Sequence, residues 1–177
     1  MQLFLDGSDI DKIREYCELG LIDGVTTNPS IILKSGKNMI EVISELAGIV
    51  SGSVSAEVSA LDSDTMVQEG IKLAEIAENV TVKLPITWDG LKACKTLSNK
   101  GISVNMTLCF SSSQALLAAK AGAEYVSPFI GRLDDLNLEG IDLISDIKLI
   151  YSNYKFSTKI PVSYTHLRAH ENLPYLV

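Results

Sequence analysis

A single lysine stands inside a short run of strand-forming residues, 80–84, which Pro85 ends. β-Branched and apolar residues bounded by proline predict a buried strand, and Lys83 falls within it. Taking an ammonium group out of water is costly, so a buried lysine loses its proton more readily than an exposed one. A neutral amine can attack a carbonyl carbon to form a Schiff base. The alternative is that Lys83 extends its charge to water from the end of the strand.

Other polar residues recur at or just after the ends of predicted strands. The strands centre near residues 4, 25, 57, 82, 104 and 126, and helices are expected at 10–19, 39–50, 62–78, 88–100, 111–121 and 140–154. Strict alternation of strands and helices predicts a parallel sheet. The polar residues at the strand ends are Asp6, Asn28, Glu57, Lys83, Asn105, Thr107 and Ser127.

Two parallel architectures compete, an open doubly wound sheet and a (β/α)8 barrel. No glycine-rich phosphate loop follows the first strand, which weakens the dinucleotide-binding form of the open sheet. In a barrel, the carboxyl ends of all strands meet at one mouth, where active sites lie. The polar strand ends therefore favour an α/β protein of the (β/α)8 TIM-barrel type. About six βα units fit before residue 160, so the barrel is expected to be incomplete, with strands seven and eight missing or replaced.

Composition narrows the class of protein. The net charge of −7 argues against a nucleic-acid surface, and no apolar run is long enough to span a membrane. The first residues carry no basic segment, so no signal peptide is expected. Cys17, Cys94 and Cys109 show neither metal-ligand spacing nor a disulfide framework, which fits a reducing cytoplasm.

A desolvated amine, two carboxylates and hydroxyls at one mouth suit carbon–carbon chemistry through a Schiff base. The amine condenses with a ketose carbonyl, and a carboxylate moves protons to and from the substrate hydroxyls. Arg132 carries a planar fork suited to a substrate phosphate. An ion pair of Arg132 with Asp134 or Asp135 is an equally good interpretation of the local sequence.

Five motifs in order resemble the transaldolase family, in particular its short subfamily, which also contains the fructose-6-phosphate aldolases. They read LD at 5–6, GVTTNPS at 24–30, VKLP at 82–85, NMTLCFS at 105–111 and SPFIGR at 127–132. The resemblance runs from residue 1 to about 160. It implies a (β/α)8 barrel and ping-pong transfer of a dihydroxyacetone unit between sugar phosphates of the pentose phosphate pathway. It also implies no metal or organic cofactor, and a homo-oligomer for a full-length chain.

The resemblance assigns roles to individual residues. Lys83 matches the Schiff-base lysine, and Asp6 matches the aspartate that shuttles a proton during bond cleavage. Glu57 and Thr107 match the pair that holds the catalytic water. Substrate-binding positions are matched by Asn28, Thr27, Asn105, Ser127 and Arg132.

The resemblance implies that two positions bear on which of the subfamily's two activities the chain has. The fructose-6-phosphate aldolases resembled here carry glutamine where Glu57 stands and tyrosine where Phe129 stands. The sequence has the transaldolase residue at both positions, and Asn105 is also transaldolase-like. We therefore expect a transferase, with a fructose-6-phosphate aldolase and an inactive truncated fragment or sugar-phosphate binder as the alternatives.

The last stretch, residues 161–177, lacks the alternation of strand and helix patterns. We expect a barrel domain at 1–160, truncated at its carboxyl end, followed by a tail of foreign origin or a disordered one. His166 and His170 fall in this stretch at a spacing that one helix face would allow. A metal site would need a further ligand, and Pro174 argues against a stable helix, so no metal is expected.

Overall fold

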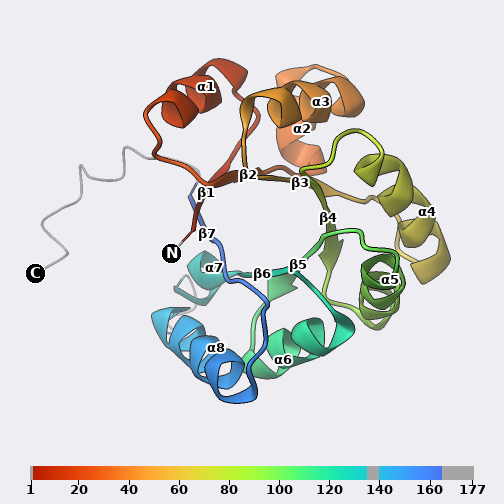
Figure 1. Ribbon diagram of the computed structural model, residues 1–177, viewed down its shortest axis with the longest axis vertical. Coiled ribbons are helices and arrows are strands. Elements are labelled where there is room, and N and C mark those ends of the chain that lie inside the picture. The colour runs from red at the N-terminus through yellow and green to blue at the C-terminus, as the bar shows by residue number, and fades with distance from the viewer. Residues whose placement is uncertain (1, 135–139, 165–177) are drawn as a thin grey trace, which may run out of the picture.

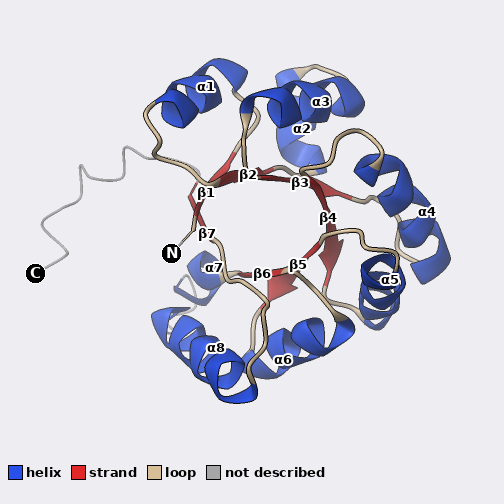
Figure 2. Ribbon diagram, viewed as in Figure 1, coloured by secondary structure: helices blue, strands red, loops and turns tan. Residues whose placement is uncertain are grey.

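The computed structural model describes residues 2–134 and 140–164. Its strands form the ring at the centre of Figure 1, and its helices lie outside that ring (Figure 2). The strands are β1 (Leu3–Asp6), β2 (Gly24–Thr26), β3 (Ser53–Glu57), β4 (Val80–Pro85), β5 (Val104–Cys109), β6 (Tyr125–Pro128) and β7 (Val162–Tyr164). The helices are α1 (Ile10–Glu18), α2 (Pro29–Ser35), α3 (Met39–Ile49), α4 (Ser63–Ala74), α5 (Trp88–Asn99), α6 (Ser112–Ala121), α7 (Ile130–Asp134) and α8 (Gly140–Tyr154).

The seven strands form one sheet in the order β6-β5-β4-β3-β2-β1-β7, and every neighbouring pair is parallel. From β1 to β6, consecutive strands are neighbours, and at least one helix lies between each strand and the next in the chain. This is the arrangement of a (β/α)8 barrel that is incomplete, as the sequence predicts. The carboxyl ends of the strands therefore meet at one end of the ring.

A short seventh strand is present in the stretch where the sequence predicts strands seven and eight to be missing or replaced. β7 pairs with β1, with Leu3 opposite Val162 and Leu5 opposite Tyr164. Just before β7, Lys159 forms a parallel bridge with Tyr125 at the start of β6. The segment therefore contacts β6 at its beginning and β1 at its end. No eighth strand occurs among residues 2–134 and 140–164.

Two short helices, α2 and α7, were not predicted. The α2 helix begins where the Asn28 side chain accepts a hydrogen bond from the Ile31 amide, and Pro29 takes the first helical position. Asparagine as the cap and proline directly after it form a standard helix start. Gly36 ends α2 with a φ of 70°, a conformation that favours glycine. The α5 helix is capped in a similar way, since the Thr87 side chain accepts a hydrogen bond from the Gly90 amide.

The outward faces of the strands form the hydrophobic core against the helices. Val54, Val82 and Met106 are fully buried members of one apolar cluster that includes residues of every helix from α3 to α6. In α4, a side chain at Gly70 would meet Leu97 at 2.8 Å and Val82 at 3.1 Å. The absence of a side chain there lets α4 approach both β4 and α5 closely.

The inward faces of the same strands are mostly polar. A row of hydroxyl groups runs from β3 across β4 to the residue before β5, since Ser53 donates to Thr81 at 2.7 Å and Thr81 lies 3.1 Å from Ser103. Near the amino ends of the strands, the rings of Phe4 and Tyr125 pack at 5.6 Å between centroids. Side chains in β-strands alternate between faces, so the polar set and the apolar core come from alternate residues.

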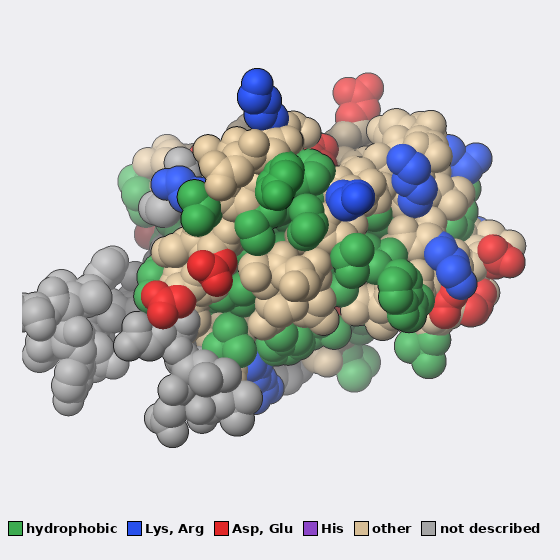
Figure 3. Space-filling model, turned by 90° about the horizontal axis from the view of Figure 1, so that it is seen from below, with side chains coloured by type: hydrophobic (Ala, Val, Ile, Leu, Met, Phe, Trp, Pro, Cys, Tyr) green, Lys and Arg blue, Asp and Glu red, His purple; other side chains and the backbone are tan. Residues whose placement is uncertain are grey.

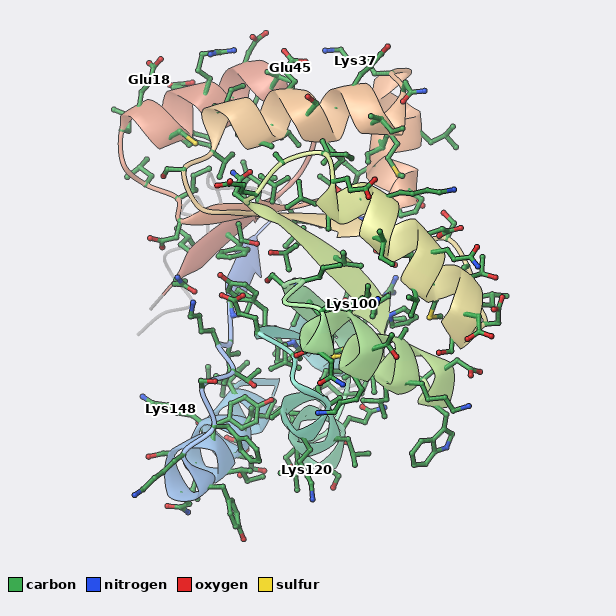
Figure 4. All side chains as sticks on the ribbon, turned by 45° about the vertical axis from the view of Figure 1, so that its right-hand side comes forward. Glu18, Lys37, Glu45, Lys100, Lys120 and Lys148 are labelled. Atoms are coloured by element: carbon green, nitrogen blue, oxygen red, sulfur yellow. The ribbon has the colours of Figure 1, made fainter. Side chains whose placement is uncertain are left out.

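Charged side chains of the helices lie on the outside. Figure 4 shows Glu18 and Lys148 pointing away from the sheet. On the side of the molecule seen in Figure 3, apolar and charged side chains are interspersed. Within the described residues, no helix combines the length and the apolar character that a membrane span requires.

Candidate active site

Lys83 lies in β4 with its amine among polar groups of the neighbouring strands. It is in register with Glu57 of β3 on one side and Asn105 of β5 on the other. Its Nζ lies 3.1 Å from Glu57 Oε2 and donates a 3.1 Å hydrogen bond to the carbonyl oxygen of Thr27. Lys83 is 8% exposed, and in the part of the chain that the structure describes it is the only buried charged side chain. A carboxylate and a backbone carbonyl therefore both contact the amine.

Asn105 and Ser127 are brought together beside this lysine. Asn105 is fully buried in β5. Its Oδ1 accepts a 2.9 Å hydrogen bond from Ser127 Oγ, and its Nδ2 donates to Ser55 Oγ at 3.1 Å. Three strands, β3, β5 and β6, thus contribute to one polar layer around the amide.

Asp6 lies at the end of β1 and is half-buried. Its Oδ1 accepts a 2.8 Å hydrogen bond from Thr26 Oγ1, and the two residues are in register across β1 and β2. Among the described residues, no hydrogen bond joins the Asp6 carboxylate to Lys83 directly. The carboxylate belongs to the same end of the ring, since it follows a strand at its carboxyl end.

Thr27 and Asn28 have polar side chains that are partly or wholly engaged in hydrogen bonds with the backbone. The Thr27 side chain is fully buried, and its hydroxyl donates to the Ser55 carbonyl at 2.9 Å. Thr27 therefore faces Lys83 through its backbone carbonyl and not through its side chain. Asn28 uses its Oδ1 to cap α2, at 2.9 Å from the Ile31 amide nitrogen. Its amide nitrogen is the part of the side chain that this cap leaves for a ligand.

Thr107 and Arg132 occupy the rim. Thr107 is buried two positions beyond the register of Lys83, opposite Pro85. Arg132 is exposed on the short helix α7, which directly follows β6. The sheet is irregular between these points, because β5 and β6 shift register between Met106 and Cys109. Leu108 adopts a φ of 59° there, an uncommon conformation for a residue with a side chain.

Two partly exposed phenylalanines lie next to this irregularity. The rings of Phe110 and Phe129 meet edge to face, with their centroids 5.7 Å apart. Phe129 donates its backbone N–H to the carbonyl of Cys109 at 2.9 Å, which ties the end of β6 to the end of β5. The two rings thus form a partly exposed apolar contact at the carboxyl ends of β5 and β6.

Ser55, Thr26 and Phe110 contribute to the site but were not predicted as site residues. Ser55 could have been found, because it lies two residues before Glu57 on the inward face of the same strand. Thr26 could have been found because it directly precedes Thr27. Alternation in β3 puts Ser53, Ser55 and Glu57 on one face. No comparable signal marks Phe110, since its place depends on the register shift in β5.

The arrangement supplies an amine and a carboxylate within hydrogen-bonding distance inside a largely buried layer. At 3.1 Å, Glu57 can exchange a proton with Lys83 or with a water molecule beside it. A nucleophile adjacent to a base is the signature of covalent catalysis. The buried hydroxyls and amide around them offer hydrogen bonds to a polyhydroxylated ligand.

Metal ligands and reactive thiols are not part of this arrangement. The described residues contain no group of three or more His, Cys, Asp or Glu side chains that could hold a metal ion. His166 and His170 lie outside the described residues. Burial raises the pKa of the Cys94 thiol to about 12 and that of Cys109 to about 11, so both thiols stay protonated near neutral pH.

Known proteins resemble this chain over most of its length. The family described as Transaldolase/Fructose-6-phosphate aldolase matches residues 3–168, which runs past the boundary at 160 expected from the sequence. A probable transaldolase of Roseobacter denitrificans is 66% identical over 160 residues, which are 90% of this chain and 74% of that protein. A probable transaldolase of Ruegeria sp. (strain TM1040) is 62% identical over the same shares. A probable transaldolase of Jannaschia sp. is 60% identical over 163 residues, 92% of this chain and 75% of that protein.

The family match covers nearly the whole chain, and the three relatives are each at least 60% identical to it. The parallel sheet ringed by helices agrees with them. A foreign origin of residues 161–177 stays a prediction, and of these the structure describes 161–164. The chain belongs to the transaldolase/fructose-6-phosphate aldolase family.

Proposed function

We propose that the protein transfers a dihydroxyacetone unit between sugar phosphates through a Schiff base on Lys83. The observation that carries this proposal is the buried lysine amine 3.1 Å from the Glu57 carboxylate. An amine in this place can lose its proton to Glu57 and attack the carbonyl carbon of a ketose phosphate. Water leaves, and a protonated imine forms between Lys83 and C2 of the sugar.

Cleavage of the bond between C3 and C4 follows. The electron pair of that bond moves into the protonated imine to form an enamine, and the proton of the C4 hydroxyl goes to a base. Asp6 is the proposed base, with Thr26 orienting its carboxylate through the 2.8 Å hydrogen bond. The aldose half leaves with a new carbonyl at the former C4.

The enamine then attacks an acceptor aldose, and Asp6 returns the proton to the new hydroxyl. Water, held in our proposal by Glu57 and Thr107, attacks the imine carbon and releases the product ketose from Lys83. Asn28, Asn105, Ser127 and the Thr27 carbonyl are the proposed partners of the substrate hydroxyls. Arg132, exposed at the rim, is the proposed partner of a phosphate group.

Glu57 and Phe129 favour transfer over simple aldol cleavage. The enamine survives until an acceptor arrives only if it is not protonated by water at the site. Once the proton taken from Lys83 has left with the expelled water, Glu57 is again a carboxylate and has no proton to give to the enamine carbon. Phe129 adds an apolar ring without a hydroxyl to the rim, where it packs on Phe110.

The test is an assay with fructose 6-phosphate in the presence and absence of an acceptor aldose phosphate. We expect sustained release of glyceraldehyde 3-phosphate only when the acceptor is present, because each turnover must empty the enamine. Equal release without acceptor would make the protein an aldolase. Binding of fructose 6-phosphate with no release in either case would contradict both activities and leave a sugar-phosphate binder.

A further inference from the structure

Ser55 accepts several buried hydrogen bonds from residues that lie next to Lys83. It is fully buried on β3, two residues before Glu57. Its carbonyl oxygen accepts from the Thr27 N–H at 3.0 Å and from the Thr27 hydroxyl at 2.9 Å. Its own hydroxyl accepts from Asn105 Nδ2 at 3.1 Å. One residue thus contacts both the segment that holds the Lys83 amine and the amide beside it.

The Asn105 amide is held at both of its ends. Ser127 donates to Oδ1 at 2.9 Å, and Ser55 accepts from Nδ2. A carboxamide has two N–H donors and two acceptor lone pairs. The two serines therefore occupy one donor and one acceptor, and one of each is left for a ligand in the plane that the serines fix.

We propose that Ser55 is a positioning residue for the transfer reaction, which orients the Asn105 amide toward the sugar bound at Lys83. This inference rests on the proposed function. The Ser55 side chain does not need to touch the substrate, because its hydroxyl acts on Asn105 and its backbone carbonyl acts on Thr27. Replacing the side chain alone separates the first action from the second.

Ser55→Ala removes the acceptor for Asn105 Nδ2 and leaves the Ser55 carbonyl in place. Thr27 and Lys83 keep their contacts, so trapping of the Lys83 adduct with fructose 6-phosphate and borohydride should be unchanged. The rate of transfer depends on how the sugar hydroxyls are held during bond cleavage, and small misplacements cost up to about 10²-fold. We expect kcat to fall by roughly 10- to 100-fold with a smaller change in KM.

The chain provides a matched control on the same strand. Ser53 is also buried, faces the same side, and donates a 2.7 Å hydrogen bond to Thr81, away from Asn105. Ser53→Ala therefore removes one buried hydroxyl of the same kind, with a similar loss of stability. We expect Ser53→Ala to keep the wild-type kcat. Ser55→Cys, which keeps the packing and weakens the acceptor, should lie between the wild type and Ser55→Ala.

Two further readouts test the route through Asn105. The side-chain amide signals of Asn105 in an NMR spectrum, identified by their loss in Asn105→Ala, should shift in Ser55→Ala and stay in place in Ser53→Ala. In the Asn105→Ala background, Ser55→Ala should have no further effect on kcat, because residues that act in series are not additive.

The outcomes separate this inference from the proposed function. An active wild type with equal kcat in Ser55→Ala and Ser53→Ala, or unmoved Asn105 signals, would overturn the inference alone. A full additional loss in the Asn105→Ala background would overturn the route through Asn105. A wild-type chain that gives no adduct at Lys83 would overturn the proposed function and the inference with it.

Discussion

The two faces of the same strands differ sharply in what they bury. Outward residues such as Val82 and Leu84 contact the helices and form a continuous apolar core. Inward residues such as Ser55, Lys83 and Asn105 are equally buried but are joined by hydrogen bonds and one ion pair. Buried polar groups need partners to avoid a large desolvation cost, and these residues find them across the strands.

The difference between the faces assigns them different tasks. The outward face stabilises the fold through apolar area removed from water. The inward face places an amine, a carboxylate and hydroxyls at fixed distances, at some risk to stability if any partner is lost. Substitutions on the inward face should therefore change activity, and substitutions on the outward face should change the free energy of unfolding.

The largest expected effect is on the inward face, at Lys83. Lys83→Arg keeps a positive charge near Glu57, but a guanidinium stays protonated and cannot form the imine. We expect transfer activity to fall by about 10⁴-fold or more, as for loss of a catalytic nucleophile. Steady-state rates and thermal unfolding of both proteins check this. Activity above a tenth of the wild-type value would break the assignment of the nucleophile.

Glu57 should come next. Glu57→Gln keeps a hydrogen-bonding group 3.1 Å from the lysine but removes the base. Proton transfer by a positioned carboxylate contributes about 10²- to 10⁴-fold, so kcat should fall by that factor while the protein stays folded. Transfer rates with a saturating acceptor measure it. An unchanged kcat would mean that proton transfer uses another group.

Leu84 follows Lys83 in β4 and lies on the outward face, so its substitution tests the stabilising role of that face. Leu84 is fully buried in the core, so Leu84→Ala should lower the free energy of unfolding by about 2 to 5 kcal/mol. The control is Leu117→Ala on α6, where the side chain is 41% exposed and the change should stay within about 0.5 kcal/mol. Chemical denaturation measures both variants.

Activity completes the test of Leu84. At a temperature where Leu84→Ala is folded, its adduct yield at Lys83 should equal that of the wild type. A loss of adduct in the folded variant would show that the outward face also sets the site, and would weaken the division between the faces.

The smallest effect concerns the thiols of the core. Burial raises the pKa of Cys94 to about 12 and of Cys109 to about 11, from an ordinary value of 9.0. The unfolded chain then releases these protons near pH 9 while the folded chain keeps them. Stability is therefore fully present below pH 9 and is lost as pH rises toward the folded pKa, by about 1.4 kcal/mol for each thiol at pH 10.

Urea denaturation at pH 8 and pH 10 measures this loss in the free energy of unfolding. The control is the same pair of measurements on Cys94→Ala. The variant should show a smaller decrease between the two pH values, by the share of one thiol. Equal decreases in both proteins would contradict a buried, protonated Cys94.

The alternation of strands and helices, and the polar strand ends, could be predicted because each depends on local pattern. Lys83 stands out in the sequence as the one charge within a buried run, and its neighbours Glu57 and Asn105 follow from the meeting of strand ends. These predictions needed only the order of elements and the two-residue period of a strand.

Other features depend on contacts that local pattern does not encode. β7 is three residues long, Val162 to Tyr164, and it exists through pairing with β1 far away in the chain. The turn of the Thr27 hydroxyl toward Ser55, and not toward the mouth, follows from the position of β3 beside β2. The α2 helix was missed although its signal was present in Asn28 and Pro29.

The central claim is that the Lys83 amine is the nucleophile, and borohydride trapping tests it most directly. The chain is incubated with fructose 6-phosphate, reduced, digested and mapped by mass spectrometry, with Lys92→Met as a control that removes an exposed lysine of α5. We predict a reduced sugar adduct on the peptide that contains Lys83, in the wild type and in Lys92→Met alike. Adducts only on other lysines, or no adduct in the folded protein, would contradict the account.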